Sequence, residues 1–207
     1  MSFIDFLKRL DKIFFLLINH DSSYRYLDIV MLFARNPLTW IPLYIFIGWY
    51  FFKKAGSRAW QFILVSLLTV TVTDSVSTLF KNLFERVRPC YDTEISTLVR
   101  HLVDCGGEYS FPSSHAANHF GLATLWFWCI LKMTGKKWNW LWIWATTVSY
   151  AQIYVGKHFP SDVAVGALLG VLVGTAMSKI FELFQDSKLS SQKIPFRFSG
   201  KHAQNQI

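Results

Sequence analysis

Charged residues are scarce in this chain, at 16% of 207 residues, and acidic residues are fewer than basic ones, 13 against 21. A soluble domain usually carries about 25% charged residues, so the composition argues against an ordinary water-soluble domain. Cysteine is also rare: three Cys cannot hold 207 residues together, which excludes a small disulfide scaffold. Hydrophobic residues make up 52% of the chain, which excludes a disordered protein.

Aromatic residues are abundant, with nine Trp and nineteen Phe, more than one water-soluble core of this size normally uses. The composition therefore predicts an integral membrane protein. In such a protein a net charge of +8 reflects the Lys and Arg of cytoplasmic loops. We therefore expect no nucleic-acid partner.

Five apolar stretches approach the roughly 20 residues that a membrane-spanning helix needs. They are Leu38–Phe52, Ala59–Phe80, Ser114–Leu131, Trp138–Val155 and Val163–Phe181. The predicted fold class is all-α, a polytopic transmembrane helix bundle of five to six spans. We expect the bundle to occupy residues 38–185 and a polar cytoplasmic tail to occupy residues 186–207.

The N-terminal segment, residues 1–37, has a different pattern. Phe3–Asn19 is amphipathic, with apolar residues at helical spacing and cations between them. We expect two interfacial helices, near Phe3–Asn19 and Tyr24–Ala34. The alternative is a single irregular sixth span.

Basic residues gather in two short connections, 53–58 and 132–137, and after Ser178. Together these segments hold eleven cations and two acids, a charge of +9, whereas the rest of the chain sums to −1. The positive-inside rule places the basic segments in the cytoplasm. Pro89–Pro112 and His158–Asp162 then share the opposite, periplasmic face.

Three groups of reactive side chains lie at that face. Lys81 and Arg88 are seven residues apart, which would place them on one helical face if the helix persists. The alternative for both is snorkelling at the membrane interface.

The second group is Ser113, Ser114 and His115, where a polar loop enters a helix, and a helix N-terminus is a natural anion site. The alternative is an ordinary Ser cap beside an incidental His. The third group is His158 with Asp162 four residues later, which suggests an imidazole oriented for nucleophilic attack. The alternative is an Asp cap beside a surface His.

Taken together, two cations, a helix N-terminus with hydroxyl groups and a His–Asp pair predict a phosphate site. The sequence contains no carboxylate cluster or Cys/His spacing suited to a metal ion, so we expect neither metal nor cofactor. Side chains would supply the positive charge.

The order and spacing of these groups resemble the type-2 phosphatidic acid phosphatase family, which includes the vanadium haloperoxidases. The family pattern is Lys, six residues, Arg-Pro; then Pro-Ser-Gly-His; then Ser-Arg, five residues, His, three residues, Asp. This chain has Lys81…Arg88-Pro89, then Pro112-Ser113-Ser114-His115, then Ala151-Gln152…His158…Asp162. The resemblance covers about residues 59–185.

The resemblance implies a role for each matching residue. His158 attacks phosphorus to form a phosphohistidine, Asp162 orients it, and His115 protonates the leaving oxygen and then activates water. The phosphoryl oxygens are held by Lys81, Arg88, Ser113, the Ser114 N–H and the residue at position 152, Gln152.

Two positions depart from the family pattern. Ser114 replaces Gly and keeps the backbone N–H. Gln152 replaces an Arg, which removes one positive charge from the site, and charge-assisted hydrogen bonds are roughly twice as strong as neutral ones. Lys157 or Arg86 are the candidates to compensate.

Cys90 and Cys105 bracket the long periplasmic loop, where disulfides persist. We predict a disulfide between them, the alternative being two free thiols. Cys129 lies inside a span as an apolar filler.

The predicted function is a metal-independent lipid phosphate or diphosphate phosphatase in the inner membrane of a bacterium, with undecaprenyl diphosphate as the first candidate substrate. Phosphatidylglycerol phosphate, phosphatidic acid and lipid A phosphates are the alternatives. A phosphotransferase using the same intermediate is the second hypothesis, and an inactive lipid-binding or transport protein the third. The expected partners are the lipid substrate and the bilayer, and the sequence leaves the oligomeric state open.

Overall fold

The structure, a computed structural model, describes residues 2–191 and is helical, without a named strand in that part of the chain. Its α-helices are α1 (Phe3–Leu16), α2 (Arg25–Arg35), α3 (Ile41–Ala55), α4 (Ala59–Phe84), α5 (Ser114–Thr134), α6 (Trp140–Tyr154) and α7 (Pro160–Ser191). The prediction of an all-α fold is confirmed for the described residues.

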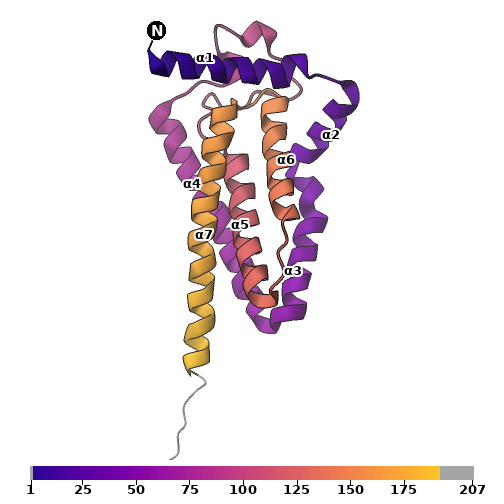
Figure 1. The fold of residues 1–207 in the computed structure, drawn as a ribbon, viewed down its shortest axis with the longest axis vertical. Helices are drawn as coiled ribbons and strands as arrows, with labels where there is room; N and C mark the ends of the chain where they lie inside the picture. Colours follow the sequence, from indigo (N-terminus) through magenta and orange to yellow (C-terminus); the bar gives the residue numbers. More distant parts are fainter. Residues whose placement is uncertain (1, 192–207) are drawn as a thin grey trace, which may run out of the picture.

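The helices form a lengthwise bundle with a cap at one end (Figure 1). Helices α3 to α7 run along the molecule, α1 lies across one end of the bundle, and α2 slants from α1 toward α3. The N-terminal segment thus forms two helices, close to the predicted bounds, and not one irregular span. The N-terminus of α1 is stabilised by a capping box that Ser2 and Asp5 form at its first turn.

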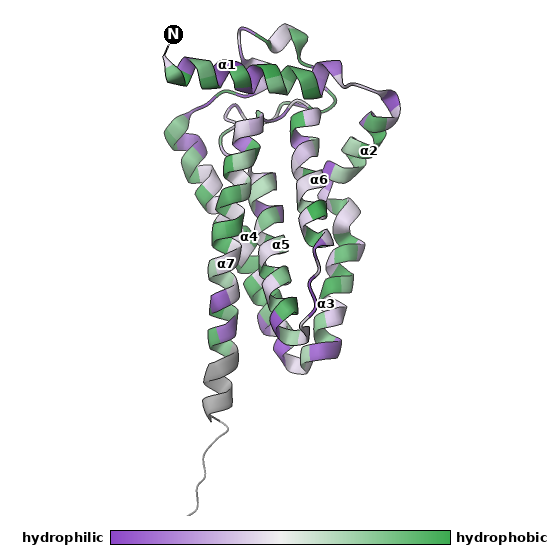
Figure 2. Ribbon diagram, in the orientation of Figure 1, coloured by the Kyte–Doolittle hydropathy of each residue, from purple (hydrophilic) through white to green (hydrophobic). Residues whose placement is uncertain are grey.

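Apolar residues dominate the lengthwise helices, and polar residues gather at α1 and at the two ends of the bundle (Figure 2). By length and composition, two helical stretches can cross a membrane: Pro37–Phe84, which contains α3 and α4, and Pro160–Phe184 in α7. The count of five to six spans remains a prediction.

Helix α7 continues beyond the predicted tail boundary at residue 186 as far as Ser191, because no Gly or Pro interrupts the sequence before Pro195. The remainder of the predicted tail, residues 192–207, lies outside the described residues.

The bundle packs around α5, and α7 brings its backbone close to the backbone of α5 at three glycines. A Cβ atom added at Gly166, Gly170 or Gly174 would overlap a backbone carbonyl of α5 or of its N-cap. Small residues allow helices to approach closely in a membrane. The glycine spacing on α7 therefore serves packing within the bundle.

The cap is tied to the bundle by buried polar contacts. The Asn19 side-chain amide donates to the carbonyl oxygens of Tyr154, at 2.8 Å, and of Arg100, at 3.1 Å, and its oxygen accepts from the Arg100 N–H at 2.8 Å. Asp28 of α2 accepts from the Tyr154 hydroxyl at 2.6 Å and pairs with the Arg100 guanidinium at 2.8 Å. These contacts fix the long loop before α5 against α1, α2 and α6.

Candidate active site

The three predicted groups converge at the capped end of the bundle. The contributing elements are the last turn of α4, the loop after it, the first turn of α5, the connection between α6 and α7, and the first turn of α7. Residues from all three groups contact one another there, as follows.

Lys81 and Arg88 reach the site from different elements. Helix α4 ends at Phe84, and Glu85 takes a left-handed conformation with φ of 47°. The condition for Lys81 and Arg88 to share one helical face, a helix that persists to Arg88, is therefore not met, because α4 ends at Phe84. Lys81 Nζ donates to Ser114 Oγ at 2.6 Å.

Arg88 is held in its loop by the backbone. Its N–H donates to the carbonyl of Glu108 at 3.0 Å, and Nη1 donates to the carbonyl of Lys157 at 3.0 Å. Nη1 also lies 3.4 Å from His158 Nε2. The guanidinium thus faces the ring nitrogen that points away from Asp162, and burial lowers the pKa of Arg88 from its ordinary value.

Ser113 begins α5 as its N-cap and is fully buried. Its hydroxyl accepts from the Ala116 N–H at 3.4 Å, and its own N–H donates to the Asp162 carbonyl at 2.9 Å. The first turn of α5 is therefore joined directly to the first turn of α7. Free N–H groups at this helix start suit an anion.

His158 is 3% exposed, and its Nδ1 lies 3.8 Å from Asp162 Oδ2. This is ion-pair range without a hydrogen bond, and Nδ1 has no hydrogen-bond partner among the described residues. Burial lowers the pKa of His158, with the Asp162 charge acting in the opposite direction. The ring is thus kept in the neutral form that a nucleophile requires.

His115 is the second residue of α5, and its ring stacks nearly parallel to His119 with centroids 6.3 Å apart. The charge of Lys81 acts on the His115 ring. It therefore belongs to the same electrostatic environment as the other predicted site residues.

A network that the sequence analysis missed surrounds Asp162. Arg86 Nη1 donates to Asp162 Oδ1 at 2.7 Å, and Arg86 Nη2 pairs with Asp11 of α1 at 2.6 Å. The Ser161 N–H donates to Asp11 at 2.9 Å, and the Phe159 N–H donates to Asp162 Oδ2 at 2.8 Å. Arg86 is already paired with the carboxylates of Asp11 and Asp162. It is therefore not a free cation that could replace the positive charge that Gln152 lacks.

One signal in the sequence points to Asp11. It lies four residues before Phe15, which is fully buried, so both residues face inward from α1. An acidic residue on the apolar face of an amphipathic helix indicates a buried partner.

Lys157 and Gln152 complete the surroundings of His158. Lys157 Nζ donates to the Cys105 carbonyl at 2.8 Å, and burial, followed by the charges of Arg88 and Arg35, lowers its pKa to about 8. Gln152 is 1% exposed, and its Nε2 has no hydrogen-bond partner among residues 2–191.

Cys90 and Cys105 form a disulfide with Cα atoms 6.4 Å apart, which closes the loop beside Arg88. Cys129 is free and buried. Within the described residues, no group of three or more His, Cys, Asp and Glu side chains is arranged to hold a metal ion.

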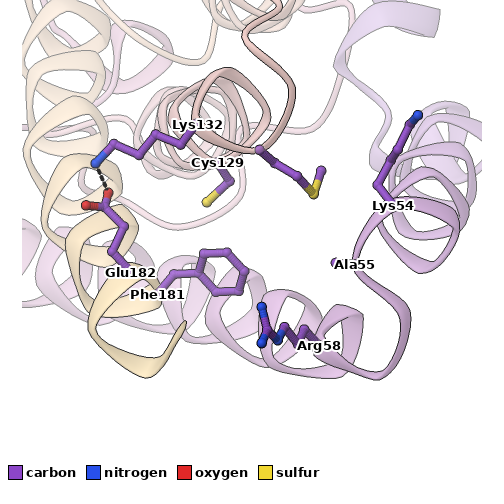
Figure 3. A pocket seen from close by; sticks show the side chains of 8 residues that line it. Lys54, Ala55, Arg58, Cys129, Lys132, Phe181 and Glu182 are labelled. Carbon is purple, nitrogen blue, oxygen red and sulfur yellow. Dashed lines mark ion pairs between the residues drawn. The ribbon is translucent and has the colours of Figure 1, made fainter. Parts of the chain in front are cut away.

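A cavity of about 500 Å³ lies away from the site, where the α3–α4 turn meets α5 and α7 (Figure 3). It is lined by Lys54, Ala55, Arg58, Cys129, Lys132, Met133, Phe181 and Glu182. None of the predicted site residues lines it.

The fold and the site together define a class: helical membrane proteins with a His–Asp pair, a second His and several cations gathered at one end of the bundle. The sequence model of the PAP2 superfamily matches residues 59–186. The chain belongs to this superfamily and is a lipid phosphatase.

Three similar proteins illustrate the relationship. A lipid A 4'-phosphatase of Bacteroides thetaiotaomicron is 33% identical over 204 residues, which cover 95% of this chain and 88% of the relative. A putative undecaprenyl-diphosphatase, YbjG of Escherichia coli, is 26% identical over 176 residues, covering 84% and 83%. The crystal structure of a transmembrane PAP2-type phosphatidylglycerolphosphate phosphatase from Bacillus subtilis shares the fold, with a TM-score of 0.66 at 21% identity over 92% of this chain and 89% of that one.

Proposed function

We propose that this phosphatase removes a phosphate group from a lipid A-type glycolipid through a phosphohistidine at His158. The observation that carries the chemistry is the placement of the buried His158, with Nδ1 toward Asp162 and Nε2 toward Arg88. The support for the substrate is the similarity to a lipid A 4'-phosphatase over nearly the whole chain.

In the first step the Nε2 lone pair of His158 attacks phosphorus, a P–N bond forms, and the P–O bond to the lipid breaks. His115 gives a proton to the departing oxygen. The Asp162 carboxylate stabilises the positive charge that develops on the imidazole ring and keeps its own negative charge. Lys81, Arg88 and the free N–H groups at the start of α5 hold the phosphoryl oxygens.

In the second step His115 takes a proton from water, whose oxygen attacks the phosphorus. The P–N bond breaks, and inorganic phosphate leaves with His158 restored to its neutral form. No metal ion is assigned a role in either step.

Undecaprenyl diphosphate is the second candidate substrate. The similarity to a putative undecaprenyl-diphosphatase over 176 residues favours it. The same nucleophile would attack the terminal phosphorus, and undecaprenyl phosphate would be the leaving group.

We also propose a multi-pass location in the bacterial inner membrane with the site on the periplasmic side. Three cations, Lys54, Arg58 and Lys132, line the cavity remote from the site, as the positive-inside rule expects for a cytoplasmic end. The Cys90–Cys105 disulfide near the site suits an oxidising compartment.

The deciding experiment is phosphate release by the purified protein in mixed micelles. The panel contains lipid A, undecaprenyl diphosphate, phosphatidic acid and phosphatidylglycerol phosphate, each with and without orthovanadate or EDTA. We expect fastest release from lipid A, inhibition by vanadate and no effect of EDTA. Inactivation by EDTA would contradict the metal-free mechanism, and preference for undecaprenyl diphosphate would contradict the first substrate.

Adding a second lipid with free hydroxyl groups tests the phosphotransferase hypothesis. A hydrolase releases inorganic phosphate at an unchanged rate, whereas a phosphotransferase moves the phosphate to the added lipid. Absence of release and transfer from every lipid would leave the lipid-binding or transport hypothesis.

A further inference from the structure

Arg35, the last residue of α2, carries a charge that nothing in the described structure neutralises. Its side chain is half-buried, its Nε is buried without a hydrogen-bond partner, and no ion pair to it occurs within residues 2–191. Arg86 and Arg100, by contrast, pair with carboxylates. A charge that is partly removed from water without a partner is costly, so its presence needs a cause.

The position of Arg35 in the fold explains why a charge is kept there. The preceding residue, Ala34, is buried in one cluster with Ala151 and Val155 of the α6 end, where α2 lies against α6 (Figure 1). Gln152 is the neighbour of Ala151 in that helix. The end of α2 is therefore packed beside the segment that leads into His158.

Electrostatic interactions link the same guanidinium to two residues of the proposed site. The charge of Arg35 acts on the His115 ring and on Lys157, although neither is near it in sequence. His115 is the proposed general acid, and Lys157 directly precedes the proposed nucleophile His158.

A second unsatisfied polar group marks the same place. Gln152 is 1% exposed, and its Nε2 donates to no described residue. Buried polar groups in folded proteins are nearly always hydrogen-bonded, so two unsatisfied groups beside one site indicate a missing acceptor. A phosphoryl group offers three oxygens that match the planar fork of a guanidinium.

We propose that Arg35 is a phosphate-binding residue, whose guanidinium and the Gln152 amide together hold the phosphoryl oxygens. Arg35 then supplies from α2 the charge that position 152 lacks. This inference rests on the proposed function. Arg35 lies outside residues 59–186, the segment that the superfamily model matches.

The test measures orthovanadate inhibition and kcat/KM in the full chain for Arg35→Gln, Arg35→Lys and the control Arg25→Gln, which changes an exposed residue of the same helix. Arg35→Gln should weaken vanadate inhibition and lower kcat/KM by about tenfold to a hundredfold, the range for losing a hydrogen bond to a charged group. Arg35→Lys should lose less, Arg25→Gln should match the wild type, and Arg35→Gln with Gln152→Arg should recover activity.

Thermal unfolding without ligand separates binding from a structural role. Because Arg35 has no partner within residues 2–191, Arg35→Gln should keep the Tm of the wild type, while vanadate should raise the Tm of the variant less than it raises the wild-type Tm. A variant that unfolds, or one with wild-type vanadate inhibition, would overturn the proposal.

The two proposals fail in different ways. If the wild type hydrolyses lipid phosphates and Arg35→Gln does so equally well, only the role of Arg35 is refuted. If the wild type hydrolyses no lipid phosphate but binds vanadate through Arg35, only the proposed function is refuted.

Discussion

The two ends of the bundle differ in how their ion pairs are exposed to solvent. At the capped end, Arg86 bridges Asp11 and Asp162, whose side chains are 9% and 0% exposed. At the other end, Lys132 pairs with Glu182 while both stay in contact with solvent, at 51% and 34% exposed. Buried charges with several partners have one geometry, whereas exposed charges can move. The first kind can orient reacting atoms, and the second kind cannot.

The ion pairs at the two ends should also contribute differently to the stability of the protein. Removing one partner of a buried pair leaves an uncompensated charge and typically costs about 3–5 kcal/mol. Removing one partner of an exposed pair costs about 0–1 kcal/mol. Equivalent substitutions at the two ends should therefore have very different effects.

The largest effect is expected for His158→Ala at the capped end. Removal of the nucleophile should lower kcat by at least about a thousandfold and leave the protein folded. Phosphate release and thermal unfolding measure the two quantities, and His20→Ala, at an exposed position, is the control. Full activity of His158→Ala would remove this residue from the mechanism.

Arg86→Met should destabilise the protein by about 3 kcal/mol, because Asp11 and Asp162 lose their shared cation. We also expect a lower kcat, because Asp162 no longer has a fixed orientation toward His158. Denaturant unfolding and steady-state kinetics test this prediction. Wild-type stability would show that the buried network contributes nothing.

Asp11→Asn should have a smaller effect, about tenfold on kcat with little change in KM, because Asn keeps the shape and a hydrogen bond but loses the charge. The matched control is Asp5→Asn in the exposed first turn of the same helix. Equal kcat values for the two variants would separate α1 from the chemistry.

Lys157 gives the prediction about pH. Its pKa in the folded protein is about 8, so it is charged below that pH and neutral above it. Arg88, Arg35 and Asp104 are the charges that act on it. Phosphatase activity should fall as pH rises through 8, and Lys157→Arg should move this limb to higher pH. An unchanged limb would exclude Lys157 as its source.

The sign for stability follows from the same pKa. Between pH 8 and 10.5 the unfolded chain binds a proton at Lys157 that the folded chain has lost, so this residue makes stability rise with pH in that window. Lys157→Met should remove that rise from the pH dependence of unfolding.

The smallest effect is expected at the far end of the bundle. Lys132→Met should change stability by less than about 1 kcal/mol and leave kcat unchanged. A large loss of activity would contradict the separation of roles between the two ends.

Local patterns in the sequence predicted the helices and the three motifs. The five long helices could be predicted because each corresponds to one run of apolar residues, and the hydropathy of a run is read from that run alone. The His158–Asp162 pair could be predicted because the two residues are only four positions apart. The end of α4 before Arg88, with Glu85 in the left-handed region, was not predicted, since a left-handed non-Gly residue has no reliable sequence signal. Asp11 and Arg35 were missed for another reason. Arg86, which pairs with Asp11, and His115, on which the Arg35 charge acts, lie more than 70 residues away along the chain, so only the fold brings these residues together.

The close contact between α5 and α7 at Gly166, Gly170 and Gly174 limits how far the spacing within the candidate site can change. Where backbone meets backbone, Cα–H groups can donate weak hydrogen bonds to carbonyl oxygens, and no rotamer change can widen or narrow the contact. Gly166 lies against the Ser113 carbonyl, directly behind the residue that begins α5. The spacing between the first turn of α5 and the helix that carries Asp162 is thus set by backbone atoms that only glycine leaves in contact, and substitutions elsewhere can alter the charge of the candidate site without changing its width.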